Sequence, residues 1–296
     1  MSFSVYLPLV LALPLALAAR RIAARGTPGP AAWTLTATAV LAAAASTWSL
    51  AMLALTLLDD VPPLAALDDH PALELPEPVP GLVALAAAIL LIGGAIRLAL
   101  DVRRRIGTNR RLRAIGDPTH GVVIADWSAP MAVAVPGTAR GHGHLLITTG
   151  ILRLLSVGER RVVFAHERAH LAHGHHRLTA AASAAAAVNP LLIPVREAVV
   201  FLVERWADED AAADVGDRGL AAQAVARAAL AASGVEAGSV LGIGGGAAVQ
   251  RVQALTRPVP APLRRRLAGP ALLAVAIVVV AGAATEAFVD LARAWL

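Results

Sequence analysis

The sequence lacks cysteine and lysine and has few aromatic residues. Its 296 residues include 26 basic ones, all of them arginine, and aromatic side chains make up only 3%. The absence of cysteine excludes disulfides, thiolate zinc sites and cysteine nucleophiles. Charged residues are scarce as well, at 16% against about 25% in an ordinary soluble domain. The composition therefore excludes a typical soluble protein.

Apolar residues are abundant instead. They make up 57% of the chain, mostly as Ala, Leu and Val, and the mean hydropathy is +0.65. The net charge is +5, but the arginines lie beside apolar runs, as in membrane proteins, so we expect a lipid bilayer and no direct nucleic-acid partner. Arginine without lysine in an alanine-rich chain is typical of a GC-rich bacterial genome. Together with the apolar composition, we expect the inner (plasma) membrane of a bacterium.

Four apolar stretches are candidates for spans of the bilayer. They are Phe3–Ala19, Ala31–Leu58, Gly81–Ile96 (continuing past Arg97 to Leu100) and Leu267–Thr285. A cleaved signal peptide is the alternative for the first stretch. Signal peptides carry their positive charge before the apolar run, whereas Arg20, Arg21 and Arg25 follow it here, so we favour a span.

A fifth apolar stretch, Leu178–Val203, is interrupted by Asn189, Pro190, Pro194, Arg196 and Glu197. Proline ends or kinks a helix because it lacks an N–H and its ring clashes with the preceding turn. This pattern predicts two shorter helices that meet at a kink and dip partly into the membrane.

The arginine distribution predicts the orientation of the spans. Arginines flank the first loop, follow the third span at 103–105, 110, 111 and 113, and precede the last span at 264–266. The loop between the second and third spans has six acidic residues and no arginine. An even alternation then places both chain ends outside and residues 101–266 in the cytoplasm.

The polar middle of the chain predicts a small sheet followed by a helix. Three β-prone runs, Gly121–Ala125, Met131–Val135 and His144–Thr149, are separated by Pro, Gly and Ser. Ser156 with Glu159 three residues later forms a capping-box pattern, which predicts a helix through His173 that ends at Gly174.

That helix carries the motif His166-Glu167-Arg168-Ala169-His170, an HExxH. Residues i and i+4 lie on one face of a helix, about 6 Å apart along its axis, so both imidazoles can reach one Zn²⁺ ion. Glu167 is rotated about 100° from His166, where it can approach a water without binding the metal. We expect it to act as general base and then to pass the proton to the leaving amine.

Three residues are candidates for the third ligand. His173 is too far along the helix from His166 to share one ion. His176 lies where HExxHxxGxxH metallopeptidases place their third histidine, but His173 replaces the required glycine and all methionines lie upstream of the motif, so the methionine turn of that class is missing.

The favoured third ligand is Glu204, in the pattern Glu204-Arg-Trp-Ala-Asp208. The kinked apolar stretch can return the chain to the same side of the membrane, and Glu204 and Asp208 share a helix face. Glu204 would bind the metal, and Asp208 would accept a hydrogen bond from the far nitrogen of a histidine ligand. The alternative is a solvated acidic helix, since Glu209 and Asp210 follow directly.

Other features favour simpler interpretations. His173, His175 and His176 suggest either an accessory metal site or, as we favour, a polar helix end. Gly242, Gly244 and Gly246 predict a flexible loop rather than a nucleotide-binding one. Arg251 and the run 264–266 are candidates for polarising a substrate carbonyl, although membrane flanking explains the run better.

In combination these residues resemble the BlaR/MecR-type integral membrane zinc peptidases. HERAH on a helix, an apolar stretch with Asn189-Pro190-Leu191 and then ExxAD at 204–208 carry the likeness, which covers roughly residues 81–255. HtpX-type and CAAX-prenyl-protease families are more distant relatives with the same plan. The resemblance implies zinc on His166, His170 and Glu204, Glu167 as base, Asp208 behind the ligands, a site facing the cytoplasm, and cleavage of a repressor or of the peptidase itself. BlaR/MecR proteins carry a penicillin-binding sensor after the last span; the chain ends soon after it here, so we expect none.

These observations predict a mainly α membrane protein with about four transmembrane helices, a kinked membrane-associated hairpin and a small cytoplasmic α+β zincin-like domain. The expected divisions are 1–100, 101–266 (including the segment 178–203) and 267–296. The expected function is a zinc endopeptidase acting on a protein or peptide substrate, with a cytosolic transcriptional repressor as one candidate. A quality-control protease of the HtpX kind and a non-catalytic zinc-binding protein are the alternatives. A metal transporter is disfavoured, because the spans before the HExxH helix contain no acidic residue or histidine.

Overall fold

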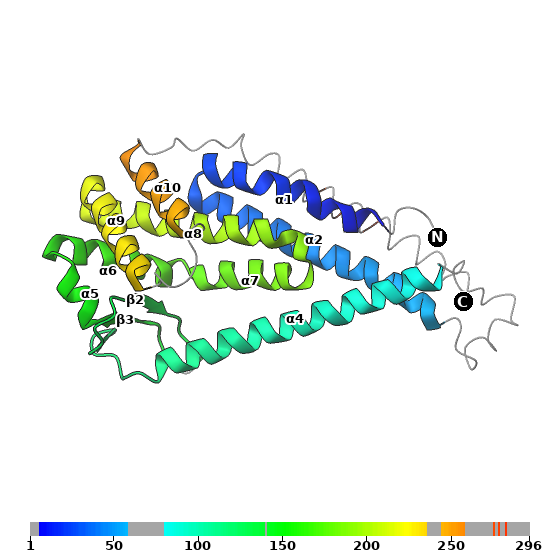
Figure 1. The fold of residues 1–296 in the computed structure, drawn as a ribbon, viewed down its shortest axis with the longest axis horizontal. Coiled ribbons are helices and arrows are strands. Elements are labelled where there is room, and N and C mark those ends of the chain that lie inside the picture. Colours follow the sequence, from blue (N-terminus) through cyan, green and yellow to red (C-terminus); the bar gives the residue numbers. More distant parts are fainter. Residues whose placement is uncertain are drawn as a thin grey trace, which may run out of the picture.

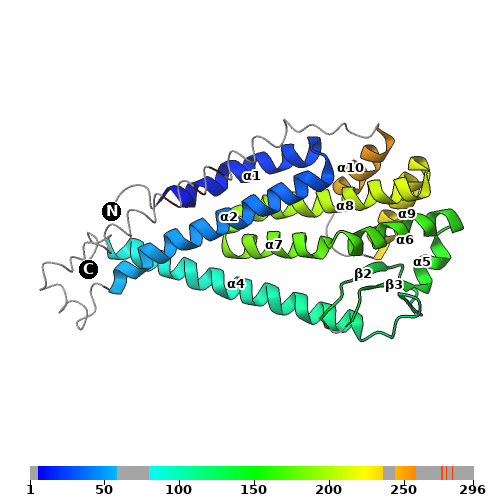
Figure 2. The same ribbon diagram turned by 180° about the vertical axis from the view of Figure 1, so that it is seen from behind.

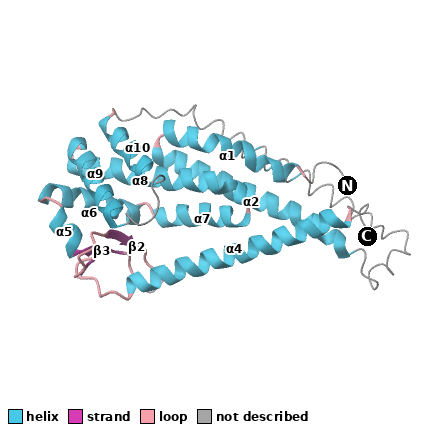
Figure 3. Ribbon diagram, in the orientation of Figure 1, coloured by secondary structure: helices cyan, strands magenta, loops and turns pink. Residues whose placement is uncertain are grey.

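The structure, a computed structural model, describes residues 6–58, 80–139, 141–235 and 244–257, with the isolated residues Val275, Val278 and Gly282. Its elements are α1 (Leu7–Arg25), α2 (Pro28–Leu55), η2 (Thr56–Leu58), α4 (Gly81–Arg113), β1 (Val122–Ala125), β2 (Ala132–Val135), β3 (His144–Thr148), α5 (Thr149–Leu154), α6 (Val157–Ala172), α7 (His175–Val188), η3 (Pro190–Leu192), α8 (Ile193–Val215), α9 (Arg218–Val235) and α10 (Gly244–Thr256). Figures 1 and 3 show α1, α2, α4, α7 and α8 side by side, with the sheet and α5, α6, α9 and α10 gathered at one end.

Three of the four predicted spans are helices long and apolar enough to cross a membrane: α1, α2 and α4. The most apolar window of α4 is only 17% buried inside the protein, so most of its apolar surface faces outward, as expected of a helix in contact with lipid. The predicted fourth span, Leu267–Thr285, the acidic loop and the arginine run 264–266 lie outside the described residues, apart from three isolated positions within that span.

The helices pack through small side chains. The largest buried cluster joins α1, α2, α7 and α8 and consists mainly of alanine, together with leucines such as Leu15, Leu35 and Leu202. Small residues let helix backbones approach closely, and this close packing holds helices together where lipid removes the hydrophobic drive. Gly94 of α4 shows the same effect, since a Cβ there would lie 3.2 Å from the carbonyl oxygen of Val188 in α7.

The predicted kinked hairpin is present as α7, η3 and α8, which turn at Asn189 and Pro190. The Asn189 side chain accepts a hydrogen bond from Leu191 N and donates one to Ser46 Oγ of α2. Arg97 Nε donates to Ala187 O at the C-terminal end of α7, at 2.8 Å. Figure 2 shows, as Figure 1 does, that α7 lies between α8 and α4. The hairpin therefore returns α8 to the end of the bundle where α7 begins.

The three predicted strands form one mixed sheet in the order β1-β3-β2. β1 pairs with β3 in parallel, and β2 pairs with β3 antiparallel with Ala134 opposite Leu145. The sequence left open whether Met131–Val135 or His144–Thr149 offers an open edge to a substrate. His144–Thr149 is the wrong alternative, because β3 is the central strand and both of its edges are paired; β2 is an edge strand.

The capping box at the start of α6 is confirmed. Ser156 Oγ accepts from Glu159 N, and the Glu159 carboxylate accepts in return from Ser156 N at 2.8 Å. Arg227 of α9 pairs with the same buried carboxylate at 2.9 Å. At the other end, Gly174 adopts the left-handed conformation (φ 61°) that lets the chain reverse between α6 and α7.

α9 and α10 pack beside the second half of α8. Arg218, at the start of α9, forms an ion pair with Glu209 of α8 and donates from Nε to Leu255 O of α10 at 3.0 Å. The prediction of a flexible loop is wrong for Gly244 and Gly246, which lie in the first turn of α10; residues 236–243 are outside the described part of the chain.

Candidate metal centre

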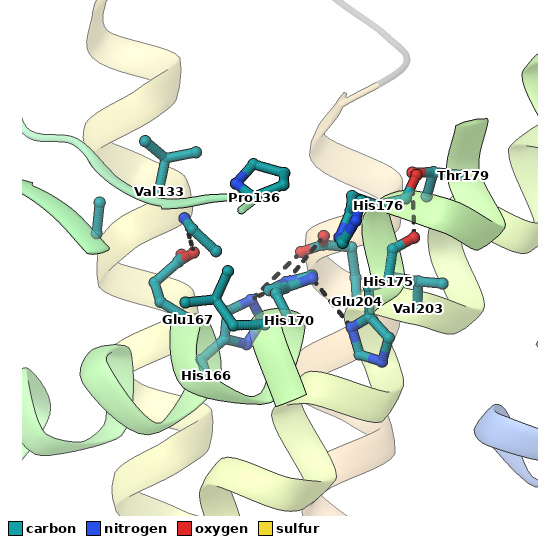
Figure 4. A pocket seen from close by; sticks show the side chains of 13 residues that line it. Val133, Pro136, His166, Glu167, His170, His175, His176, Thr179, Val203 and Glu204 are labelled. Atoms are coloured by element: carbon teal, nitrogen blue, oxygen red, sulfur yellow. Dashed lines mark hydrogen bonds and ion pairs between the residues drawn. The ribbon is translucent and has the colours of Figure 1, made fainter. Parts of the chain in front are cut away.

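Two helices bring the three predicted ligands together. α6 carries His166 and His170, and α8 carries Glu204. His166 Nε2 lies 3.0 Å from His170 Nε2 and 3.6 Å from Glu204 Oε2, and His170 Nε2 lies 3.5 Å from Glu204 Oε1. Figure 4 shows the three side chains converging on one point beneath β2.

This donor set fits a zinc ion. Nitrogen and oxygen ligands bind Zn²⁺ at about 2.0–2.2 Å, so a tetrahedral arrangement places neighbouring ligand atoms about 3.3–3.5 Å apart. The three observed separations lie close to that spacing, and one ligand atom from each side chain falls within 4.8 Å of the others. Within the described residues, it is the only group of three His, Asp or Glu side chains arranged in this way.

Asp208 lies directly behind His166. Its Oδ1 is 3.0 Å from His166 Nδ1, so the carboxylate holds the proton on Nδ1 and leaves Nε2 facing Glu204 and His170. The Asp208 side chain is only 2% exposed, and Arg251 of α10 neutralises it through two hydrogen bonds of 2.7 Å. The structure thus places Asp208 where the sequence predicted an orienting residue.

Arg251 contacts Glu204 as well. Its Nη1 lies 3.0 Å from Glu204 Oε2. The guanidinium is therefore engaged by two carboxylates of the site, which assigns it a structural contact in place of the substrate contact that the sequence suggested. Sequence analysis could not foresee this role, because Arg251 is 43 residues away from Asp208 along the chain.

The electrostatics match these contacts. Burial alone would raise the pKa of Glu204, but the hydrogen bond from His166 and the charge of Arg251 lower it to about 2, so the carboxylate is ionised. Burial lowers the pKa of His170 to about 4, which keeps that ring neutral and able to bind a metal. For His166, burial is outweighed by hydrogen bonds to Asp208 and Glu204, which raise its pKa; a dication bound by the same groups would take the place of that proton.

His175 is a site residue that the sequence analysis missed. Its Nδ1 lies 3.0 Å from His170 Nδ1, and the residue is 1% exposed. Because His170 Nε2 faces the cluster, its Nδ1 carries the proton and donates to His175. Burial and the neighbouring His170 lower the pKa of His175 to about 3, which keeps it a neutral acceptor. The favoured prediction of a polar helix end is wrong for this residue, although the run of histidines was the available signal.

The other two candidate ligands lie elsewhere. His173 Nε2 pairs with Asp210 Oδ2 at 2.6 Å and stacks on Trp206, with ring centres 4.4 Å apart. His176 lines the cavity described below but does not join the three-ligand group.

Glu167 lies beside the cluster and contacts the sheet. Its Oε2 accepts a hydrogen bond of 2.7 Å from Ala134 N, on the edge of β2 that faces away from β3. Burial raises the pKa of Glu167 to about 7, because desolvation outweighs the attraction of His166. A carboxylate with such a pKa can both accept and return a proton near neutral pH.

A cavity of about 370 Å³ opens over these groups. It is lined by the β2 segment (Ala132, Val133, Ala134 and Pro136), by His166, Glu167, His170 and Leu171 of α6, by His175, His176 and Thr179 of α7, and by Val203 and Glu204 of α8. Its lining combines apolar side chains, the edge strand β2, the Glu167 carboxylate and a cluster of metal-ligand type, which are groups that hydrolysis of an extended peptide requires.

One comparison with known proteins gives a match. Residues 107–233 match the family model of Peptidase family M48, a segment that contains every residue of the cluster and Glu167 but covers less than half of the chain. No match is found among curated proteins or among solved structures. The family match supports a relation to M48 metallopeptidases and hence a metal-dependent protease.

Proposed function

We propose that this chain is a membrane-anchored zinc endopeptidase. The observation that carries the proposal is the spacing of His166, His170 and Glu204, which suits a tetrahedral zinc ion, with Glu167 beside them under an edge strand. A zinc ion there would polarise the scissile carbonyl and lower the pKa of the attacking water.

Residues of the chain bind the substrate and transfer the proton. An extended substrate lies along the outer edge of β2, where Ala134 N releases Glu167 to pair with the substrate. Glu167 accepts the proton of the attacking water and delivers it to the leaving amine nitrogen, so the C–N bond breaks and a carboxylate and an amine are released. Asp208 and His175 keep the two histidine rings oriented toward the cluster.

The test is hydrolysis by the purified, zinc-loaded protein in detergent. Casein serves as an unfolded probe, alongside the chain itself. Glu167→Gln should abolish peptide release while leaving the zinc content unchanged, whereas Glu197→Gln, on an exposed side chain of α8, should retain activity. Equal peptide release by the wild type and Glu167→Gln would overturn the proposal.

We further propose that the site faces the cytoplasm of a bacterium and serves regulatory proteolysis. The support is the arginine distribution and the resemblance to BlaR/MecR-type peptidases. A reporter inserted near Asp117 should be cytoplasmic, and an external reporter would contradict this topology.

The two proteolytic roles differ in their products. A single cut in one cytosolic regulator, absent in cells with Glu167→Gln, would support regulatory cleavage of a repressor. Many cuts in many membrane proteins would instead favour quality control of the HtpX kind.

A further inference from the structure

The polar side chains that line the cavity differ in whether they already form hydrogen bonds or ion pairs with other groups of the protein. Glu167 accepts from Ala134 N, and Glu204 pairs with Arg251. His166 pairs with Asp208, and His170 with His175. The Thr179 hydroxyl is shared between backbone carbonyls of its own helix. Each of these groups is thus engaged by the protein.

His176 is the exception. Among the described residues its ring has no hydrogen-bond partner, and the residue is only partly buried, so its nitrogens are open to the cavity. His175 Nε2 also lacks a partner, but that atom is fully buried and cannot meet a substrate. Among the side chains that line the cavity, His176 therefore carries the N–H donor that can bond to a substrate.

The position of His176 follows from the chain reversal at Gly174. α7 starts directly after this left-handed residue, and successive residues of a helix point about 100° apart. His175 therefore points inward to His170, while His176 faces the cavity. Figure 4 shows Glu167 and His176 on opposite sides of the three predicted ligands. Burial and the neighbouring Arg177 lower the pKa of His176, so the neutral ring has one N–H to donate.

We propose that His176 is a catalytic residue that stabilises the oxyanion. This inference rests on the proposed peptidase function. As the water oxygen adds to the scissile carbon, the carbonyl π electrons move to its oxygen, which accepts a hydrogen bond from the His176 ring N–H. When the C–N bond breaks, the carbonyl re-forms and the nitrogen takes the proton held by Glu167. His176 itself loses no proton in this cycle.

The kinetic test compares His176→Ala with His176→Asn, which retains a donor. Removing one oxyanion donor typically lowers kcat about 10²–10³-fold. We expect that loss for His176→Ala with KM little changed and partial rescue by His176→Asn. The control is His142→Ala, at an exposed histidine between β2 and β3 that is not part of the cavity lining, and it should lose nothing. Unchanged kcat in His176→Ala would overturn the assignment.

Two further readouts do not depend on turnover. Zinc stoichiometry should be equal in the wild type and His176→Ala; loss of zinc in the variant would mean that His176 is a ligand and would overturn the proposal.

A capped phosphinic Ala–Ala pseudopeptide, which mimics the tetrahedral intermediate, should bind the variant about 10²-fold more weakly in calorimetry, with binding of the capped Ala–Ala amide unchanged. Equal affinity of both proteins for the phosphinate would also overturn it. A wild type that hydrolyses no more than Glu167→Gln, yet shows the His176-dependent phosphinate affinity, would refute the peptidase and leave the donor assignment standing.

Discussion

The two halves of α8 belong to one unbroken helix but have opposite surroundings. The half from Ile193 to Val203 packs its buried residues against the alanine-rich faces of α1, α2 and α7. The half from Glu204 to Val215 contacts α6, α9 and α10 and carries carboxylates that are paired with His166, Arg251 and Arg218.

The difference shows what each half requires of its sequence. The apolar half needs only side chains of suitable volume, because dispersion and close approach hold it in place. The polar half needs each donor matched by an acceptor, since a buried unpaired charge is costly. Arg205 and Trp206 lie at the junction: Arg205 donates to Ala23 O at the end of α1, and a Cβ on Gly29 of α2 would lie 3.1 Å from the Trp206 ring.

The largest effect is expected for Glu204→Ala, in the polar half of α8. Removing one of three protein ligands should lower zinc affinity by more than about a hundredfold and reduce hydrolysis to background, because the neighbouring carboxylates of Glu167 and Asp208 are already bonded to Ala134 N and Arg251. Zinc content by mass spectrometry checks this. Glu197→Ala is the matched control in the other half, and retention of one zinc by Glu204→Ala would refute the ligand assignment.

The apolar half should respond in stability rather than in metal binding. Leu202 is fully buried, so Leu202→Ala should destabilise the protein by about 2–5 kcal/mol through lost contacts and a cavity. Thermal unfolding in detergent measures the effect, with Leu191→Ala, 47% exposed, as control. Protein that remains folded should bind zinc like the wild type; a large drop in its affinity would show that the two halves are coupled.

Asp208→Asn tests the carboxylate that orients the ring of His166. It should lower zinc affinity about 10–100-fold, because the amide holds the His166 tautomer less firmly and leaves Arg251 with Glu204 as its remaining carboxylate partner in the site. Titration against a zinc chelator gives the value. An unchanged affinity would mean that the ring of His166 is oriented by its packing alone.

The smallest expected effect lies at the start of α6, outside α8 itself. Ser156→Ala removes the side-chain acceptor of the capping box and should cost about 1 kcal/mol of unfolding free energy without altering zinc stoichiometry. Ser156→Thr should restore most of the stability. A loss of zinc in Ser156→Ala would indicate that the helix start also positions His166.

Local sequence patterns determined several helices and turns of this protein. The apolar runs specified three helices suited to a membrane, Ser156 and Glu159 the start of α6, Asn189-Pro190 the hairpin turn, and the i, i+4 spacing the shared face of His166 and His170. Each depends on chemistry within a few residues, which a sequence displays directly.

Tertiary structure alone decided which groups meet across the chain. It placed Glu204 rather than His176 against the two histidines, paired β3 on both sides and put β2 at the edge of the sheet. It also brought Arg251 onto Asp208 and turned His175 toward His170. These outcomes depend on how helices far apart in sequence pack together, and the free energy of that packing is shared among many residues, so no short segment of the sequence encodes it.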